Sequence, residues 1–475
     1  MSFPPLLRRV LTVTTLGSFL AFLDSSVVNV ALRPLSEGFD TSLTTIQWVI
    51  TAYLLALAAV LPVSGWAAAR FGAGRMYALS IGAFTLSSLA CGLSTSVWEL
   101  IAFRAVQGAA AAVATPVAQM LAVRAAGPER LAKAMSITGV PTVLAPILGP
   151  AVGGLLLAHV GWRWIFLINV PIGVLIVVLA MGLPREEAEE TTRFDLPGFA
   201  LLALGSLGLT YALTALGNTG NVTTSFALPG VAGLVLLAVF VGHALRVRRP
   251  LLDLRLYRNG RYAAASLANF CLGAVLFGSI IILPLYFQIV RHRDPVETGL
   301  LCIPQSIGVA VAVGLGSKII GAVGSAWAAF LGGLLNVAAT VPFVFLGDRT
   351  SFWQLGAAMV VRGFAVGGTI VPTTTAAYQS LPQAAVGDAT VQLNVLQRLG
   401  GSLSTALFAV ILQSELASAR TPVAQAAAFG TAFWWVVAVA VCATAPSVLL
   451  IVAQRAQRAE GERRSSEETE SAVAG

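Results

Sequence analysis

Fourteen apolar runs, each about as long as a helix needs to cross the hydrocarbon layer of a bilayer, dominate this sequence. Charged residues make up 11% of the chain and hydrophobic ones 57%, whereas roughly a quarter of a soluble protein is charged. We therefore predict an all-α membrane protein with fourteen transmembrane helices. The predicted spans are 10–32, 46–68, 77–95, 98–122, 134–158, 164–183, 198–216, 226–245, 262–289, 298–317, 324–346, 353–380, 391–413 and 427–453.

The loops between these runs carry an uneven share of positive charge. With the N-terminus inside the cell, 20 of the 29 Lys and Arg residues lie on the cytoplasmic side and 6 on the outer side. Because Lys and Arg are retained on the inside during insertion, this bias predicts that both termini are cytoplasmic. The first run is too long for the apolar region of a signal peptide, so we interpret it as a span in the cell (inner or plasma) membrane.

The net charge of +8 does not indicate a nucleic-acid partner. The arginines lie in short gaps between apolar runs, and they form no single basic block or helix. The four cysteines are far apart within apolar runs and lack the spacing of a metal site or a disulfide framework. We expect no metal, no cofactor other than protons as coupling ion, and partners limited to membrane lipid and a small hydrophobic substrate, with the chain a monomer.

Two polar links divide the chain. An acidic link begins at Pro184, a basic one ends at Arg261, and only two spans lie between them. Arg104 and Gly108 of the fourth span recur as Arg362 and Gly367 in the twelfth. We interpret this as a weak internal repeat with two helices inserted at its seam, and transporters built from repeats hold their substrate between the two halves. The predicted domains are 1–183 (N-terminal six-helix bundle), 184–261 (linker with two inserted helices), 262–453 (C-terminal six-helix bundle) and 454–475 (disordered cytoplasmic tail).

One acid lies well inside a span. Asp24 is in the first apolar run, among small residues at helical spacing, and an ionised Asp at the centre of a membrane helix costs about 2.5–3.5 kcal/mol. Arg104 lies inside the fourth span, where its permanent charge needs a wet cavity or an anionic partner. These residues are candidates for proton coupling. A structural role, hydrogen bonding to neighbouring helices, is the alternative for each.

The fifth span has one face with almost no side-chain bulk, where another helix can approach its backbone. Its prolines remove ladder hydrogen bonds and bend the helix. We expect such a bent, smooth face at a seam between two bundles that rock against each other, although plain tight packing would use the same residues. The residues of this motif are Gly139, Pro146, Gly149, Pro150, Gly153 and Gly154.

Several segments carry a family likeness: GWAAARFGAGR at 65–75, LIAFRAVQG at 100–108, APILGPAVGG at 145–154 and WRWIFLINVPIG at 162–173. Together with residues 23–32, 48–55 and 398–402 they resemble, in order and over almost the whole chain, the fourteen-helix drug:proton antiporters of the major facilitator superfamily (DHA2-type multidrug efflux). The resemblance implies the major facilitator fold, two six-helix bundles with two inserted helices. It also implies that the fifth-span motif marks exporters with antiport and that Arg104 helps to load and unload the proton.

The resemblance further implies a cytoplasmic gating loop formed by Gly65, Arg70, Gly72 and Arg75. Here the sequence departs from the family, because Ala69 stands where the loop usually has an Asp that latches the two halves together. Gating by that latch is therefore in doubt for this chain.

The predicted mechanism uses Asp24 as the site for which a proton and a cationic substrate compete. Burial raises the pKa of a carboxyl and a nearby cation lowers it, so a site that alternates between the two conditions changes protonation state. Because no second acid lies inside a span, we expect neutral or monocationic hydrophobic substrates. Polar side chains in spans usually face protein, so substrate contact and interhelical hydrogen bonds are both open for the other cavity candidates: Asn29, Tyr53, Gln107, Thr115, Asn269, Gln305, Asn394 and Arg398, with Phe277 as an apolar wall.

Other functions use the same spans differently. An importer, or an exporter of one natural product, would keep the fold. A membrane-embedded enzyme or receptor is the alternative from another class, but His159, His243 and His292 lie near different span ends and no catalytic cluster appears. We therefore predict no catalytic residues and no enzyme.

Overall fold

The computed structural model describes residues 3–183, 194–219 and 224–474, and every regular element in that part of the chain is a helix. The longer elements are α1 (Pro5–Val27), α4 (Trp48–Val60), α5 (Val63–Phe71), α6 (Ala73–Leu93), α7 (Val97–His159), α9 (Asn169–Ala180), α10 (Leu196–Thr219), α11 (Thr224–Arg246), α12 (Gly260–Ile289), α13 (Pro295–Val323), α14 (Ser325–Thr340), α15 (Phe352–Gln379), α16 (Val386–Ser418) and α17 (Pro422–Ala474). The shorter ones are η1 (Val28–Val30), α2 (Leu32–Gly38), α3 (Leu43–Ile46), α8 (Arg163–Leu167), η2 (Leu254–Arg258), η3 (Val341–Phe345) and η4 (Gln383–Ala385).

In the described part of the chain, 13 helical segments are long and apolar enough to cross a membrane. One of them belongs to α7, which is far too long for a single crossing because 63 helical residues extend about 95 Å. The helix breaks at Gly127, where φ is 63°, a backbone conformation that favours glycine. α7 thus contains both the fourth and the fifth predicted spans. The prediction of an all-helical membrane protein with many spans is confirmed.

Several span boundaries differ from the predicted ones, in two cases where a proline lies at or just after the break. α1 starts at Pro5, with proline at its first position, and ends at Val27 rather than at residue 32. The second predicted span is divided at Pro62 into α4 and α5, and the sixth is divided between α8 and α9, ahead of Pro171. Proline has no N–H to donate to the helical hydrogen-bond pattern and therefore breaks a helix. The length of an apolar run does not predict such a break.

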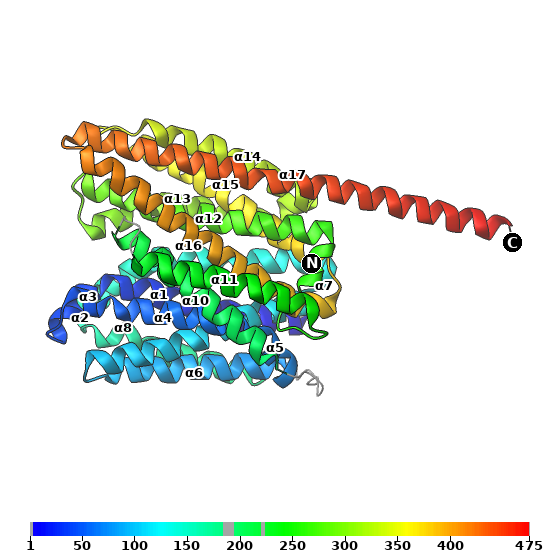
Figure 1. Cartoon of the computed structure of the whole chain (residues 1–475), viewed down its shortest axis with the longest axis horizontal. Helices are drawn as coiled ribbons and strands as arrows, with labels where there is room; N and C mark the ends of the chain where they lie inside the picture. The colour runs from blue at the N-terminus through cyan, green and yellow to red at the C-terminus, as the bar shows by residue number, and fades with distance from the viewer. Residues whose placement is uncertain (1–2, 184–193, 220–223, 475) are drawn as a thin grey trace.

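The helices lie side by side along one long axis (Figure 1). On one side α1, α4 and α6 pack against α7, and on the other α13 and α14 pack against α15 while α12 packs against α16 and α17. The pair α10 and α11 crosses the middle of this view, and α10 contacts both α4 and α16. The two sides meet mainly where α7 contacts α13, α15 and α16 and where α5 contacts α16.

The Arg-x-x-x-Gly segment and its counterpart pack in the same way in each half. A Cβ on Gly108 of α7 would collide with the Tyr53 carbonyl of α4, and one on Gly363 of α15 would collide with the Gln305 carbonyl of α13. Gly367, the predicted counterpart of Gly108, lies one turn further on and meets Val309 of α13. In both halves the helix with the buried arginine therefore contacts its neighbour backbone to backbone.

The inserted helices α10 and α11 are joined at one end by a buried acid. Asp195, just before α10, accepts hydrogen bonds from His243 Nε2 (2.9 Å), from the Gly198 amide (2.9 Å) and from the Leu251 amide (3.1 Å). Burial disfavours the charged carboxylate, but these bonds outweigh it and lower the pKa of Asp195 below its ordinary value. Most of the acidic link before it, residues 184–193, lies outside the described residues.

The C-terminal segment differs from the prediction of a disordered tail over 454–475. α17 continues as a helix to Ala474 and leaves the bundle (Figure 1). The segment is rich in Ala, Glu, Gln and Arg, which have high intrinsic helix propensity. The prediction considered only its missing apolar period.

Candidate functional site

Asp24 lies near the end of α1, is 1% exposed and accepts hydrogen bonds from three side chains. Arg104 Nη1 lies 2.7 Å from its Oδ2, and Oδ1 accepts from Gln107 Nε2 (3.1 Å) and Asn169 Nδ2 (2.7 Å). The donors come from α7 and α9, so this carboxylate joins three helices. Because all three groups donate, the arrangement matches the ionised form of the acid.

Arg104 is held by groups other than Asp24 as well. Its Nε donates to the Val49 carbonyl of α4 at 3.2 Å, and its Nη1 donates to Gln107 Oε1 at 2.7 Å. The guanidinium carbon lies 4.2 Å from the centroid of the Tyr53 ring, a favourable cation–π distance. Arg104 therefore has neutral partners that can keep it in place when the charge of Asp24 changes.

Asn169 was not among the predicted site residues, yet it contacts the acid directly. Its Nδ2 also lies 3.0 Å from Ser88 Oγ, and Ser88 donates to the Phe166 carbonyl. Its Oδ1 has no hydrogen-bond partner among the described residues. The other candidates were predicted because they are polar side chains inside an apolar run. Asn169 is also a polar side chain inside an apolar run, but it was noted only as part of the segment 162–173 that resembles the family.

The ion pair between Asp24 and Arg104 alters the expected competition for the acid. The sequence suggested that a cationic substrate would neutralise Asp24, whereas in this conformation Arg104 already does so and neither side chain is more than 1% exposed. The structure thus represents a closed, charge-balanced state of the site.

The other cavity candidates lie in different surroundings. Tyr53 and Gln107 belong to the Asp24 cluster, whereas Thr115 bonds the Ala111 carbonyl of its own helix and the exposed Asn29 bonds the Ser25 carbonyl. The remaining contacts are Asn269 with the Leu393 carbonyl, Gln305 with Arg362, Asn394 with Gln119, and Phe277 with Gly401. Among these, the bond from Asn394 Nδ2 to Gln119 Oε1 (2.7 Å) links α16 to α7 across the two halves.

Arg398 lies on α16, in the other half, and its Nε has no hydrogen-bond partner in the described part of the chain.

The small face of the fifth span does not lie wholly between the bundles, which differs from the expected seam. A Cβ on Gly139 would lie 3.0 Å from Val313 of α13, in the other half. Gly149 and Gly153 instead contact Ser26 and Val27 of α1, next to Asp24. An α-helix turns by 100° per residue, so Gly139 and Gly149, ten residues apart, point in directions that differ by about 80°. The glycines of this span therefore contact two different helices, α13 and α1. Gly154 has open space, and the side chains of Pro146 and Pro150 lie outside the described residues.

The residues of the gating loop surround the junction of α5 and α6. Gly72 lies between the two helices at a φ of 85°, and Arg70 and Arg75 lie on either side of it. Gly65 of α5 is packed against Val391 of α16. The predicted loop therefore contacts the other half through Gly65.

The described residues contain no group of three or more His, Cys, Asp and Glu side chains that could hold a metal ion. The groups that the Asp24 cluster brings together are one carboxylate, one guanidinium and two neutral amides.

Comparisons with known proteins agree on family and fold. The family model described as Major Facilitator Superfamily matches residues 14–405. The multidrug resistance protein B homolog of Mycobacterium tuberculosis is 36% identical over 411 residues, which cover 86% of this chain and 76% of that protein. Two solved structures share the fold: the human organic anion transporter MFSD10 (TM-score 0.65, 16% identity, 94% of this chain and 100% of that one) and the proton:xylose symporter XylE (TM-score 0.64, 14% identity, 92% and 94%).

Proposed function

This chain belongs to the Major Facilitator Superfamily, and we propose that it is a proton-coupled antiporter that exports hydrophobic, neutral or monocationic compounds by alternating access. It is a multi-pass membrane transporter and not an enzyme. The likeness to a protein named for multidrug resistance supports export of drugs or other toxic compounds.

The buried ion pair of Asp24 with Arg104 supports the coupling step. When the site opens to the outside, a proton binds Asp24 Oδ2 and the bond from Arg104 Nη1 breaks. Arg104 then keeps its bonds to the Val49 carbonyl and to Gln107. Release of the proton on the other side re-forms the pair. The proton and Arg104 thus compete for one carboxylate.

This competition changes how substrate charge enters the mechanism. Because Arg104 supplies the counter-charge of Asp24, the substrate needs no positive charge to balance the acid. Exchange of a neutral substrate for one proton moves one charge, which yields about 2.3 kcal/mol per 100 mV. Exchange of a monocation for one proton moves no net charge, so only the pH gradient drives it, with about 1.4 kcal/mol per pH unit.

We place the substrate site between the halves, as in other transporters built from repeats, on the side where Tyr53 of α4 packs against Arg104. Tyr53 touches the Arg104 guanidinium through its ring. A compound that displaces the Tyr53 ring therefore acts on Arg104, and through Arg104 on the protonation of Asp24.

The test is transport into inverted membrane vesicles with an imposed pH gradient and a panel of neutral and monocationic dyes and antibiotics. We expect uptake by the intact chain and none by Asp24→Asn. The control is Asp348→Asn, which changes an acid between η3 and α15, outside the cluster, and should transport normally. Accumulation driven by the pH gradient in Asp24→Asn would overturn the proposal, and uptake only in right-side-out vesicles would make the protein an importer.

A further inference from the structure

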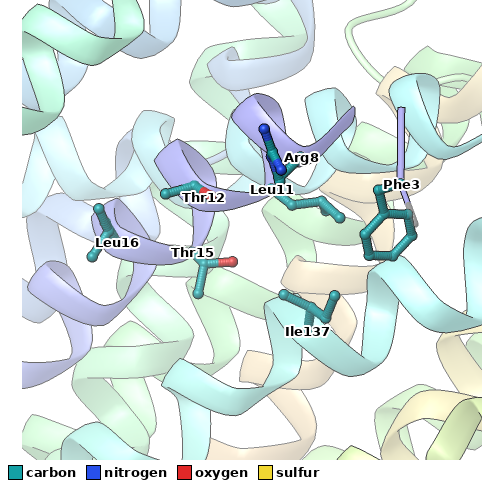
Figure 2. A pocket seen from close by; sticks show the side chains of 7 residues that line it. All are labelled: Phe3, Arg8, Leu11, Thr12, Thr15, Leu16 and Ile137. Carbon is teal, nitrogen blue, oxygen red and sulfur yellow. The ribbon is translucent and has the colours of Figure 1, made fainter. Parts of the chain in front are cut away.

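A groove of about 280 Å³ lies between the start of α1 and the second part of α7. Figure 2 shows its lining residues, of which Arg8, Leu11, Thr15 and Leu16 come from α1 and Ile137 comes from α7. Thr12 of α1 and Phe3, which precedes α1, complete it. The groove is separate from the Asp24 cluster, which none of its lining residues joins.

One end of the groove is basic. Arg8 is exposed and lines it, and Lys133 of α7 lies 4.5 Å from the centroid of the Phe3 ring that forms its wall. These two cations come from different helices, Arg8 from the first turn of α1 and Lys133 from the part of α7 that follows the break at Gly127. Both belong to the Lys and Arg residues that the charge bias of the loops predicts on the cytoplasmic side.

The rest of the groove is apolar and contains one unsatisfied hydroxyl. Leu11, Leu16 and Ile137 give it hydrocarbon walls. Thr15 Oγ1 is buried there and has no hydrogen-bond partner among the described residues, whereas the neighbouring Thr14 donates to the Val10 carbonyl of its own helix. A hydroxyl in an apolar groove is costly unless something accepts its proton.

We propose that this groove binds one anionic glycerophospholipid of the cytoplasmic leaflet. Its phosphate lies at Arg8 and Lys133, an acyl chain lies along Leu11, Leu16 and Ile137, and an ester carbonyl accepts from Thr15 Oγ1. Two cations beside an apolar slot suit an anion with a hydrocarbon tail. They repel a lipophilic cation, so the groove is not an entrance for the monocationic substrates proposed above.

The same groove touches a helix that links the two halves. Ser136, next to Ile137, accepts a hydrogen bond from the Ser317 amide of α13 at 3.1 Å, and Gly139 contacts Val313 of that helix. A lipid bound against Ile137 therefore lies directly beside the contact between the halves.

The experiment measures lipid retention by native mass spectrometry of the purified full chain, with phosphatidylglycerol and phosphatidylcholine of identical acyl chains. We expect selective retention of phosphatidylglycerol, and roughly thirtyfold weaker binding by the double variant Arg8→Ala/Lys133→Ala. The matched control is Arg9→Ala, because Arg9 Nη2 turns toward the Leu179 carbonyl of α9. It should retain the lipid as the intact chain does.

Two further variants keep the test decisive if the double variant folds poorly. Arg8→Lys/Lys133→Arg preserves both charges and should keep the selectivity, and Ile137→Trp fills the groove and should weaken binding of both lipids. Equal loss in Arg9→Ala, undiminished retention in Arg8→Ala/Lys133→Ala, or displacement of the lipid by tetraphenylphosphonium would each overturn the proposal.

Discussion

Arg104 Nη1 lies 2.7 Å from Asp24 Oδ2 although 80 positions separate the two residues, and both side chains are almost completely buried. The pair joins α1 to α7 at the height where Gly149 and Gly153 of α7 also meet α1. The first helix is thus held by a charge and by close backbone contact at one place. In the mechanism proposed above, a change in the protonation of Asp24 therefore acts on α1 at the place where these glycines touch it.

Removing the charge of Asp24 should destabilise the fold as well as stop transport. Asp24→Asn leaves Arg104 buried without an anion, which costs about 3–5 kcal/mol. The double variant Asp24→Asn/Arg104→Gln removes the unpaired cation and should regain much of this stability without regaining transport. Thermal unfolding in detergent, measured beside vesicle transport, checks both. A double variant that is as unstable as Asp24→Asn alone would contradict this.

Asn169 should contribute more than its neighbour Ser88. Asn169→Ala removes a 2.7 Å hydrogen bond to the charged Asp24, worth about 1.5–3 kcal/mol, whereas Ser88→Ala removes neutral bonds worth about 0.5–1.5 kcal/mol. Denaturation midpoints of the two variants give the comparison. Equal effects would show that Asn169 does not stabilise the carboxylate.

Gly108 should not tolerate a methyl group. In Gly108→Ala the Cβ collides with the Tyr53 carbonyl, so α7 must move away from α4 and Arg104 loses its position. The control is Gly82→Ala in α6, where a Cβ meets nothing within 4 Å and alanine favours the helix. We expect Gly108→Ala to lower the folded yield and transport, and Gly82→Ala to change neither. The monodisperse fraction on size-exclusion chromatography measures the yield.

Holding the two halves together at Gln119 and Asn394 should stop transport. Their side chains are hydrogen-bonded across α7 and α16 at 2.7 Å, so cysteines at both positions can be joined by a short, cleavable bifunctional thiol reagent. We expect transport by Gln119→Cys/Asn394→Cys to fall on cross-linking and to recover on cleavage. Gln119→Cys alone should be insensitive to the reagent. Undiminished transport after complete cross-linking would mean that this contact stays closed throughout the cycle.

The acid that joins α10 and α11 should confer a dependence of stability on low pH. Hydrogen bonds lower the pKa of Asp195 in the folded state, so its contribution is complete above the unfolded value of about 4 and is lost as pH falls through the lower folded value. Thermal unfolding of the intact chain should therefore weaken more steeply below about pH 4 than that of Asp195→Asn. Parallel curves for the two proteins would contradict this.

Much of the fold could be read from local sequence properties. The apolar runs predicted the helical membrane protein because the cost of placing charge in a bilayer is paid residue by residue. The helix breaks at Pro62 and Gly127 also have a local cause, because each depends on the backbone chemistry of one residue. The helical end of α17 was missed because helix propensity does not need an apolar period.

The sequence by itself placed an acid, Asp24, and a permanent cation, Arg104, inside spans, where each needs a partner. Only the tertiary structure decided that they are partners of each other, that Asn169 joins them, and that Gly149 faces α1 while Gly139 faces the other half. The physical reason is that burial in a membrane depends on each segment alone. The choice of partner depends on how helices far apart in the chain rotate and pack against one another.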